Sequence, residues 1–292
     1  MKKTIEYLVT ILLLILTIIF WNDIKFIAAN IIYDNSTFDD NNYSKSENYD
    51  AFTRVNEVTI KNEEDIFNLI YSVIDSGANE FSVICPREYK DCISDVNNIT
   101  KNENLSFINS FVSPFNNYKK YYVYANGLGK VTIEIEKKYS NEQIEYVNNK
   151  LDEIENEIIK ENMSTKEKIK VFHDYIVKNT KYDKEAANSD LYTSNTAYEL
   201  LKNGKAICGG YADTIALYLD RLNLPNIKIN SKDHVWNLVY IDNEWLHIDA
   251  TWDDPTAYEA INHNYFLIST KELALLNDDK HNFYTIFKEA IN

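Results

Sequence analysis

The segment KAICGGYADTIALYLDRL, residues 205–222, contains Cys208, the third of only three cysteines, next to two of the chain's six glycines. Glycine is used where a backbone turns sharply or approaches another group closely. Apolar residues recur at three- and four-residue spacing after Cys208 until Pro225, which predicts a helix that begins at the cysteine. A helix N-terminus favours the reactive thiolate. A free cysteine is otherwise usually a small buried residue, so this pattern alone leaves both interpretations open.

Downstream, DHVWNLVYIDNEWLHIDATWDDP contains two alternating runs on either side of Asp242 and Asn243. This pattern predicts a β-hairpin with a two-residue turn, in which Ile241 pairs with Glu244. Apolar residues then gather on one face, as a core-facing surface requires, and only Asn237 is an exception. The residues on this face are Val235, Val239, Ile241, Leu246, Ile248 and Ala250.

The same register pairs Trp236 with Asp249 and places His234 diagonally opposite Asp249 on the other face. Diagonal residues of an antiparallel pair have Cα atoms about 7–8 Å apart, a distance that two side chains can close. A slip of one residue would place them on opposite faces. A carboxylate beside a histidine fixes its tautomer and stabilises the imidazolium. With Cys208, these residues are the parts of thiol nucleophilic catalysis.

Other histidines and acids compete for these roles, and alone each is more often an ordinary structural residue. His247 shares the face of His234 but lies one pair nearer the turn. Asp253 and Asp254 lie beyond the paired length and precede Pro255, where a turn is expected. The sequence places no acidic partner for the three remaining histidines, which are His173, His263 and His281.

The chain has 292 residues, enough for one large or two modest domains, and 45 acidic against 30 basic residues, a formal net charge of −15. Nucleic-acid binding requires a basic surface, so this balance argues against it and disfavours anionic partners generally.

Residues 7–22 carry no charge and follow Lys2 and Lys3. This pattern predicts a membrane anchor with the lysines in the cytoplasm and the remainder outside. Cleavage as a signal peptide near residues 27–29 is the alternative.

In an oxidising compartment, Cys85 and Cys92 could form a disulfide, and with no histidine nearby they make a poor metal site. Cys208 would then remain as a lone, reactive thiol.

The local patterns divide the chain into four parts: a membrane anchor at 1–30, a flexible linker at 31–51, a small α/β domain at 52–139 and a catalytic domain at 140–292. In the small domain we expect strands at 55–60, 80–85 and 105–112, a helix from Asn62 to Gly77, a weaker helix at about 88–97, and a hairpin turning at Asn126-Gly127. Two capping boxes, Ser140 to Gln143 and Ser164 to Glu167, predict helices that open the catalytic domain.

The segments AICGGYADTIALYLDRLNLP, DHVWNLVYIDNEWLHIDATWDDP and NHNYFLIST resemble, in this order, the core of the transglutaminase-like superfamily. The resemblance runs from about residue 165 to 285, and that family shares its fold with papain-like cysteine proteases. It implies an α+β fold in which a helix bearing the cysteine packs on an antiparallel sheet bearing the histidine and the acid.

By position, the resemblance makes Cys208 the nucleophile, His234 the base and Asp249 the group that orients the base. It implies acyl transfer on amides through a thioester, without a cofactor. The backbone N–H of Cys208 would supply one oxyanion donor. Tyr182 is a weak candidate for a second donor against an ordinary packing role. Nothing in the sequence matches the calcium loops or additional β-domains of animal transglutaminases, so neither metal activation nor true cross-linking is implied.

These features favour a membrane-anchored, extracytoplasmic enzyme that acts on amide bonds of surface proteins or wall peptides, with an exposed glutamine or other amide as its partner. Water could replace an amine as the acceptor, which would make the protein a cysteine peptidase or a peptidoglycan hydrolase. A binding or assembly module that keeps the fold without catalysis is the third hypothesis.

Overall fold

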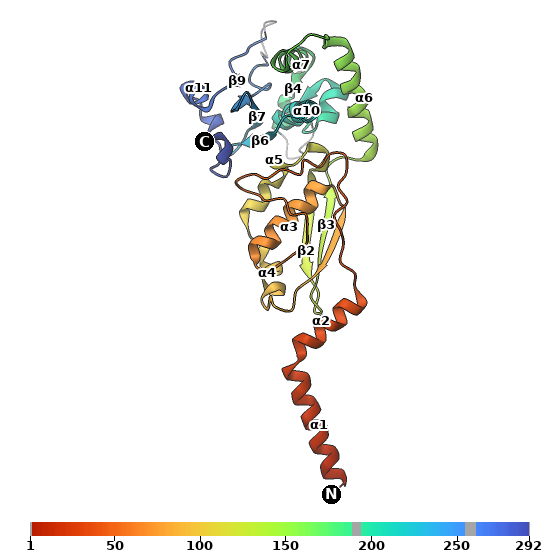
Figure 1. Cartoon of the computed structure of the whole chain (residues 1–292). Helices are drawn as coiled ribbons and strands as arrows, with labels where there is room; N and C mark the ends of the chain where they lie inside the picture. The colour runs from red at the N-terminus through yellow and green to blue at the C-terminus, as the bar shows by residue number, and fades with distance from the viewer. Residues whose placement is uncertain (1, 189–193, 255–260, 292) are drawn as a thin grey trace.

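Two N-terminal helices point away from the rest of the chain in the computed structural model, which describes residues 2–188, 194–254 and 261–291 (Figure 1). Helix α1 spans Lys2–Ile19 and buries none of its residues, and α2 spans Trp21–Ile32. Among the described residues, no single helix is long and apolar enough to cross a membrane. Helices α1 and α2 meet that criterion only as a pair, with a bend of 71° between them. The membrane anchor therefore stays a prediction.

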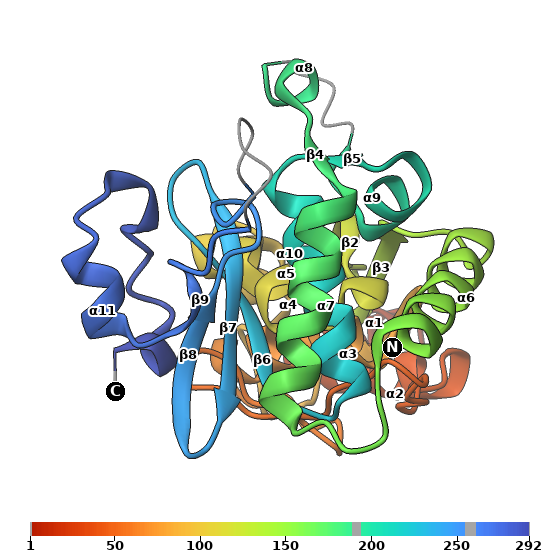
Figure 2. The same cartoon turned by 90° about the horizontal axis from the view of Figure 1, so that it is seen from above.

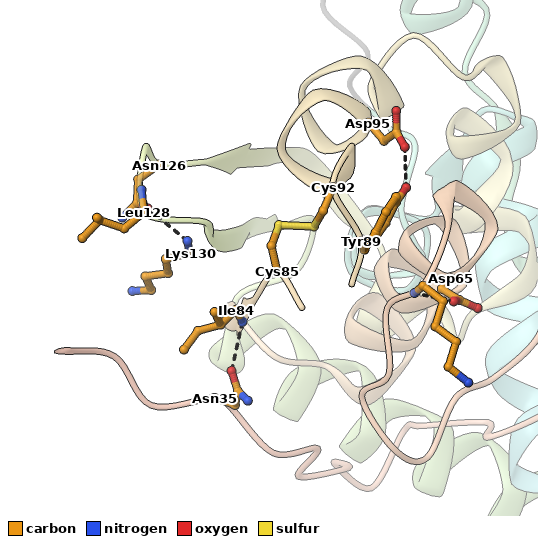
Figure 3. Close-up of a disulfide and its surroundings, with 11 residues drawn as sticks. Asn35, Asp65, Ile84, Cys85, Tyr89, Cys92, Asp95, Asn126, Leu128 and Lys130 are labelled. Carbon is orange, nitrogen blue, oxygen red and sulfur yellow. Dashed lines mark hydrogen bonds between the residues drawn. A yellow bond between two sulfur atoms is a disulfide. The ribbon is translucent and has the colours of Figure 1, made fainter. Parts of the chain in front are cut away.

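The segment after α2, for which the sequence predicts a flexible linker, has no helix or strand but contacts both folded parts. Its Ser36 donates a backbone hydrogen bond to Ser82 of strand β1 (Glu80–Ile84) at 2.7 Å. The side chain of Asn35 accepts from the Ile84 N–H at 2.9 Å (Figure 3). Further along, Lys45 donates to the Asn226 carbonyl in the second half of the chain at 2.8 Å. The segment thus lies along the edge of β1 and then reaches the second half.

The small N-terminal unit is an antiparallel sheet of order β1-β3-β2 with helices on it. Its other elements are α3 (Glu63–Ser76), α4 (Cys92–Ile99), β2 (Tyr118–Ala125) and β3 (Lys130–Lys137). As predicted, Asn62 caps α3 by accepting from the Asp65 N–H, and Gly77 ends the helix with a φ of 78°. Cys85 and Cys92 form a disulfide that joins the end of β1 to the start of α4 (Figure 3).

Two local predictions in this unit are wrong, and the hairpin with Asn126-Gly127 at its turn is confirmed. Residues 55–60 form no strand. Residues 105–112 form the turns η1 (Glu103–Phe107) and α5 (Ile108–Phe111) instead of a strand, because Leu105, Ile108 and Phe111 are buried at the three-residue spacing of a helical turn. The hairpin loop contains four residues, 126–129, and its positive φ of 89° lies at Gly129. A 3₁₀ turn, η2 (Pro114–Asn116), precedes β2.

The second half begins with the two helices that the capping boxes predict, α6 (Asn141–Ile158) and α7 (Thr165–Asn179), and both boxes are complete. Helix α10 (Cys208–Arg221) packs on an antiparallel sheet of order β6-β7-β8-β9 (Figure 2). The strands are β6 (Asn226–Asn230), β7 (Val235–Ile241), β8 (Glu244–Ile248) and β9 (Phe266–Ile268). The predicted α+β class, with the cysteine on a helix against an antiparallel sheet, is confirmed.

Shorter elements surround this core. They are the parallel pair β4 (Lys181–Tyr182) and β5 (Lys205–Ala206), the helices α8 (Lys184–Ala187), α9 (Ala197–Asn203) and α11 (Thr270–Leu275), and the turns η3 (Asp279–His281) and η4 (Lys288–Ala290).

The sheet of the second half is buried on both faces. One face, including Val239 and Ile248, joins a hydrophobic cluster with α10. The other face, including Trp236 and Leu238, joins the cluster that fills the small N-terminal unit and includes Phe287 near the C-terminus. The division at residue 140 stays a prediction, and the hydrophobic core is shared across it. The second half is therefore held against the N-terminal unit through the face of the sheet that includes Trp236 and Leu238.

Candidate active site

Cys208 is the first residue of α10, as the sequence predicts, and its neighbouring glycines allow other segments to approach. A Cβ on Gly210 would lie 2.7 Å from the Ala206 Cβ, closer than real Cβ atoms pack, and in a tight contact of 3.1 Å with the Thr196 carbonyl oxygen. A Cβ on Gly209 would overlap the side chain of Asn195. The glycines therefore let the segment before α9 press against the start of α10, and this contact holds the thiol at the helix N-terminus.

The hairpin register is confirmed. Strands β7 and β8 pair antiparallel from Ile241 opposite Glu244 to Asn237 opposite Ile248. The two turn residues have φ values of 55° and 65°, which a two-residue hairpin turn requires. Asn237, the polar exception on the core face, is 1% exposed and donates from its amide to the Ala212 carbonyl of α10 at 2.9 Å. This hydrogen bond ties the strand to the helix that carries Cys208.

The diagonal pair is in contact: His234 Nε2 lies 2.5 Å from Asp249 Oδ2, and both side chains are buried. The other oxygen of Asp249 accepts from the Thr251 N–H at 2.9 Å and the Trp252 N–H at 3.2 Å. The Cys208 thiol lies close enough to the His234 side chain to help raise its pKa, and both residues line the same cleft. Since Asp249 occupies Nε2, Nδ1 is the ring nitrogen that remains for the thiol. The imidazole thus contacts a carboxylate and neighbours a thiol.

The charges of this cluster support one another. Burial by itself lowers the pKa of His234, but the charge and hydrogen bond of Asp249, followed by the contact with Cys208, outweigh burial and raise it to about 10. Burial raises the pKa of Asp249, but its interactions with His234 and His281 bring it well below the usual range. At neutral pH the carboxylate is therefore ionised and stabilises a protonated imidazole.

His281 belongs to this cluster, although the sequence places no acidic partner for it. Its Nε2 lies 2.9 Å from Asp249 Oδ2, and its Nδ1 lies 2.7 Å from Asp278 Oδ1. The ring is buried and stacks on Tyr265 with a centroid distance of 4.7 Å. The doubly protonated ring is the form in which both nitrogens can donate to carboxylates. The one local signal for this residue was an aspartate three positions earlier.

His247 has a different environment, in agreement with its position one pair nearer the turn. It accepts at Nδ1 from the Trp236 indole at 3.0 Å, and its Nε2 lies 3.0 Å from the Thr270 hydroxyl. Burial, followed by the charge of His281, lowers its pKa to about 3, so this ring is neutral. It fixes Trp236, whose ring stacks on His234 with a centroid distance of 5.5 Å. His247 thus supports the site from outside it.

The competing acids bind elsewhere. Asp253 is fully buried with an oxygen 3.2 Å from His173 Nε2, and Asp254 accepts from the Tyr211 hydroxyl at 2.6 Å. His263 pairs with Asp174 at 2.6 Å. His173, His263 and His281, for which the sequence places no acidic partner, thus each have one in the folded chain. Pro255, expected at a turn, lies outside the described residues.

Within the described ranges, two groups of side chains bring three ligand atoms close enough for a metal ion. One contains His173, Asp174 and His263, and the other contains His234, Asp249 and His281. In both groups each of these atoms already faces a partner of opposite hydrogen-bonding character in the chain. A proton between histidine and aspartate therefore explains why these atoms lie close together in both groups. The expectation that the protein holds no metal stays a prediction.

Tyr182 lies near Cys208, whose charge acts on its hydroxyl. It is in β4, opposite Ala206 of β5, two residues before the cysteine. Burial, followed by the charges of Cys208 and Asp249, raises the pKa of its hydroxyl, so the hydroxyl keeps its proton at neutral pH. A protonated phenol can donate a hydrogen bond, and its role as an oxyanion donor stays a prediction.

Comparison with known proteins agrees with the sequence resemblance. Residues 152–250 match the family model of the transglutaminase-like superfamily, and Cys208, His234 and Asp249 all lie within the match. Over residues 152–250 the chain is therefore similar to the transglutaminase-like superfamily. No curated protein sequence matches the chain.

A solved structure described as "Crystal structure of a TGase" is similar with 20% identity and a TM-score of 0.35. The similarity covers 51% of this chain and 48% of that one, so the chain spans about half the length of the structure it matches. At this TM-score the likeness carries no argument about mechanism.

Proposed function

We propose that the protein is a thiol-dependent acyl-transfer enzyme that acts on amide bonds through Cys208, His234 and Asp249. The observation that carries this proposal is that His234 contacts the Asp249 carboxylate and shares a cleft with the Cys208 thiol, which helps raise its pKa. An imidazole in that position can take the thiol proton while the carboxylate stabilises the resulting charge. The start of α10 adds the positive end of a helix dipole beside the sulfur.

The reaction follows from these positions. The Cys208 thiolate attacks the carbonyl carbon of an amide, and the negative charge moves to the carbonyl oxygen, which the backbone N–H of Cys208 can stabilise. Protonated His234 then gives its proton to the leaving nitrogen, the C–N bond breaks, and a thioester remains on the sulfur. An incoming amine or water gives a proton to His234 and attacks the thioester, which releases the acyl group and regenerates the thiol.

We also propose that α1 and α2 anchor the enzyme to a membrane and that the remaining chain acts outside the cytoplasm on surface proteins or wall peptides. Two features support this location. Helix α1 exposes its apolar side chains along its whole length, which is costly in water. The disulfide between Cys85 and Cys92 is typical of oxidising compartments.

The test uses the full-length protein, purified in detergent and incubated with a glutamine-bearing protein and a fluorescent primary amine. Mass spectrometry of both proteins reports an acyl adduct on Cys208 and the fate of the acyl group. We expect a thioester on Cys208 and none in a Cys208→Ala variant that remains folded. Fluorophore incorporation means transfer to an amine, and glutamate formation or peptide cleavage without incorporation means hydrolysis. No adduct and no turnover with any amide would contradict the proposal and leave the binding-module hypothesis.

A further inference from the structure

The cleft at Cys208 has walls from both halves of the chain. It has a volume of about 560 Å³ and includes Cys208 and His234. The catalytic half supplies α10, β6 and the loop before β7. The N-terminal unit supplies Ser106, Asn109, Ser110, Asn117 and Lys138. Ser110 of this wall donates to Asn230 of β6 at 3.3 Å, so the two walls are in contact. The small unit therefore forms part of the surface that any substrate of Cys208 must touch.

The charges in this cleft are unbalanced. Two lysines share one buried carboxylate: Lys228 Nζ lies 2.6 Å from Asp213 Oδ1, and Lys138 Nζ lies 3.1 Å from Asp213 Oδ2. Lys232 adds a third positive charge from the loop before β7. Among the described residues of the lining, the other acid is Asp233, which pairs with Lys280 outside the cleft. In a chain of net charge −15, this cleft is locally positive.

A buried charge is costly unless a counter-charge lies beside it. Lys228 is 7% exposed, and burial, opposed by Asp213 and reinforced by Lys138, lowers its pKa to about 8. Ser231 in the same wall is 5% exposed, and its hydroxyl finds no hydrogen-bond partner among the described residues. Asp213 balances only one of the two lysines that share it, so an anionic group with free acceptor oxygens would balance the second and give Ser231 a hydrogen-bond partner.

We propose that this cleft recognises an acidic peptide, with a carboxylate of the substrate held by Lys138, Lys228 and Lys232 while an amide of the same peptide meets Cys208. The inference rests on the proposed function, because it names the substrate class of the same site. It also gives the N-terminal unit a role, since that unit lines one wall of the cleft and carries Lys138. The overall negative charge of the protein disfavours acidic partners elsewhere on its surface and leaves this cleft as the place that accepts them.

Two alkylating reagents of similar size test the charge without a known substrate. Iodoacetate is an anion and iodoacetamide is neutral, and both modify Cys208, the cysteine that the disulfide leaves free. The ratio of the two rates in the full-length protein reports the electrostatic potential at the sulfur. We expect Lys232→Gln and Lys138→Gln to lower the iodoacetate-to-iodoacetamide ratio between about twofold and about 15-fold. A unit charge about 10 Å away gives this range for effective dielectric constants between roughly 80 and 20.

Lys166→Gln is the matched control, because Lys166 is exposed and pairs with Asp242 at the opposite end of the hairpin from His234. This variant should leave the ratio unchanged. A ratio unaffected by the cleft variants, or lowered equally by the control, would overturn the inference. In either case the inference about the cleft would fail, but Cys208 would still react and the proposed function would stand. If Cys208 reacted with neither reagent, the proposed function itself would be contradicted. Exposed Lys232 keeps the test valid if Lys138→Gln does not fold.

Protection gives a second readout with defined peptides. A peptide of glutamates around one central glutamine should slow the alkylation of Cys208 by iodoacetamide, and it should protect less in Lys232→Gln. The same peptide with lysines in place of the glutamates should protect less than the acidic peptide does. Equal protection by both peptides, or stronger protection by the lysine peptide, would overturn the proposal.

Discussion

His281 shares the same oxygen of Asp249 that binds His234: its Nε2 lies 2.9 Å from Asp249 Oδ2. Asp278 holds the opposite side of the His281 ring at 2.7 Å, and Tyr265 stacks on it. The carboxylate that orients His234 is thus itself fixed from the C-terminal segment. His281 therefore acts as a positioning residue for the site, without contact with the sulfur in this arrangement.

A pair of variants separates the hydrogen bond of His281 from its bulk. His281→Leu leaves Asp249 one donor short, and loss of a hydrogen bond to a buried charge should destabilise the fold by about 1.5–3 kcal/mol. Alkylation of Cys208 should slow as the orientation of His234 relaxes. His281→Gln keeps an N–H donor and should recover part of both losses. Urea unfolding and alkylation rates measure the two effects, and a Gln variant no better than the Leu variant would refute the positioning role.

Asp249→Asn tests the electrostatic link between the carboxylate and His234. Loss of the negative charge should bring the pKa of His234 down from about 10 toward the ordinary value for histidine, because burial would then be opposed less. Turnover of an amide substrate should fall by roughly 10³- to 10⁴-fold, as it does when a buried acid of this kind is neutralised. NMR titration of the histidine rings reports the pKa. Asp254→Asn is the matched control, since Asp254 binds Tyr211, and the prediction fails if both variants shift His234 equally.

The raised pKa of His234 also predicts how stability depends on pH. A group whose pKa is higher in the folded chain than in the unfolded chain stabilises the fold while it is protonated. Its contribution is therefore complete below about pH 6.5 and is lost as the pH rises through about 10. The difference in free energy of unfolding between the wild-type chain and His234→Gln should shrink by up to roughly 5 kcal/mol over this window. A difference that stays constant from pH 6 to 11 would be incompatible with a raised pKa.

The two glycines after Cys208 should differ in their tolerance of alanine. Alanine is the better helix former by about 1 kcal/mol, which favours both substitutions. At Gly210 the new Cβ meets the Ala206 Cβ and the Thr196 backbone oxygen, neither of which can move freely, so overpacking of about 1–3 kcal/mol should dominate. At Gly209 it meets the Asn195 side chain, which can rotate away. Thermal unfolding should show Gly210→Ala to be the less stable variant, and the opposite order would contradict this account of the glycines.

Patterns of residues close together in the sequence predicted the hairpin register, the start of α10 and two further helix starts. The alternation of residues 235–250 fixed the hairpin register, since a slip of one residue would have exposed the whole apolar face. Helix periodicity placed Cys208 at the start of α10. The capping boxes at Ser140 and Ser164 predicted two helix starts, because each box satisfies its own backbone groups within four residues.

The features that the sequence did not predict depend on contacts between segments that are far apart in the chain. His281 reaches Asp249 from a segment 32 residues away that has neither helical nor strand periodicity, so no spacing rule connects them. Asp213 of α10 pairs with Lys228 of β6 and with Lys138, the residue after β3. Only the packed structure brings these three charges together. The apolar run at 105–112 suited a strand or a helix equally, and packing against neighbouring elements decided for helical turns.

The most direct test of the central claim is the rate at which iodoacetamide alkylates Cys208 at pH 7 in the wild-type chain and in His234→Gln, with His247→Gln as the control histidine. An adjacent imidazole that takes the thiol proton makes the cysteine a stronger nucleophile. We expect His234→Gln to slow alkylation at least about tenfold and His247→Gln to slow it far less. Equal rates in the wild-type chain and His234→Gln would mean that the ring does not activate the sulfur, and the proposed chemistry would be wrong.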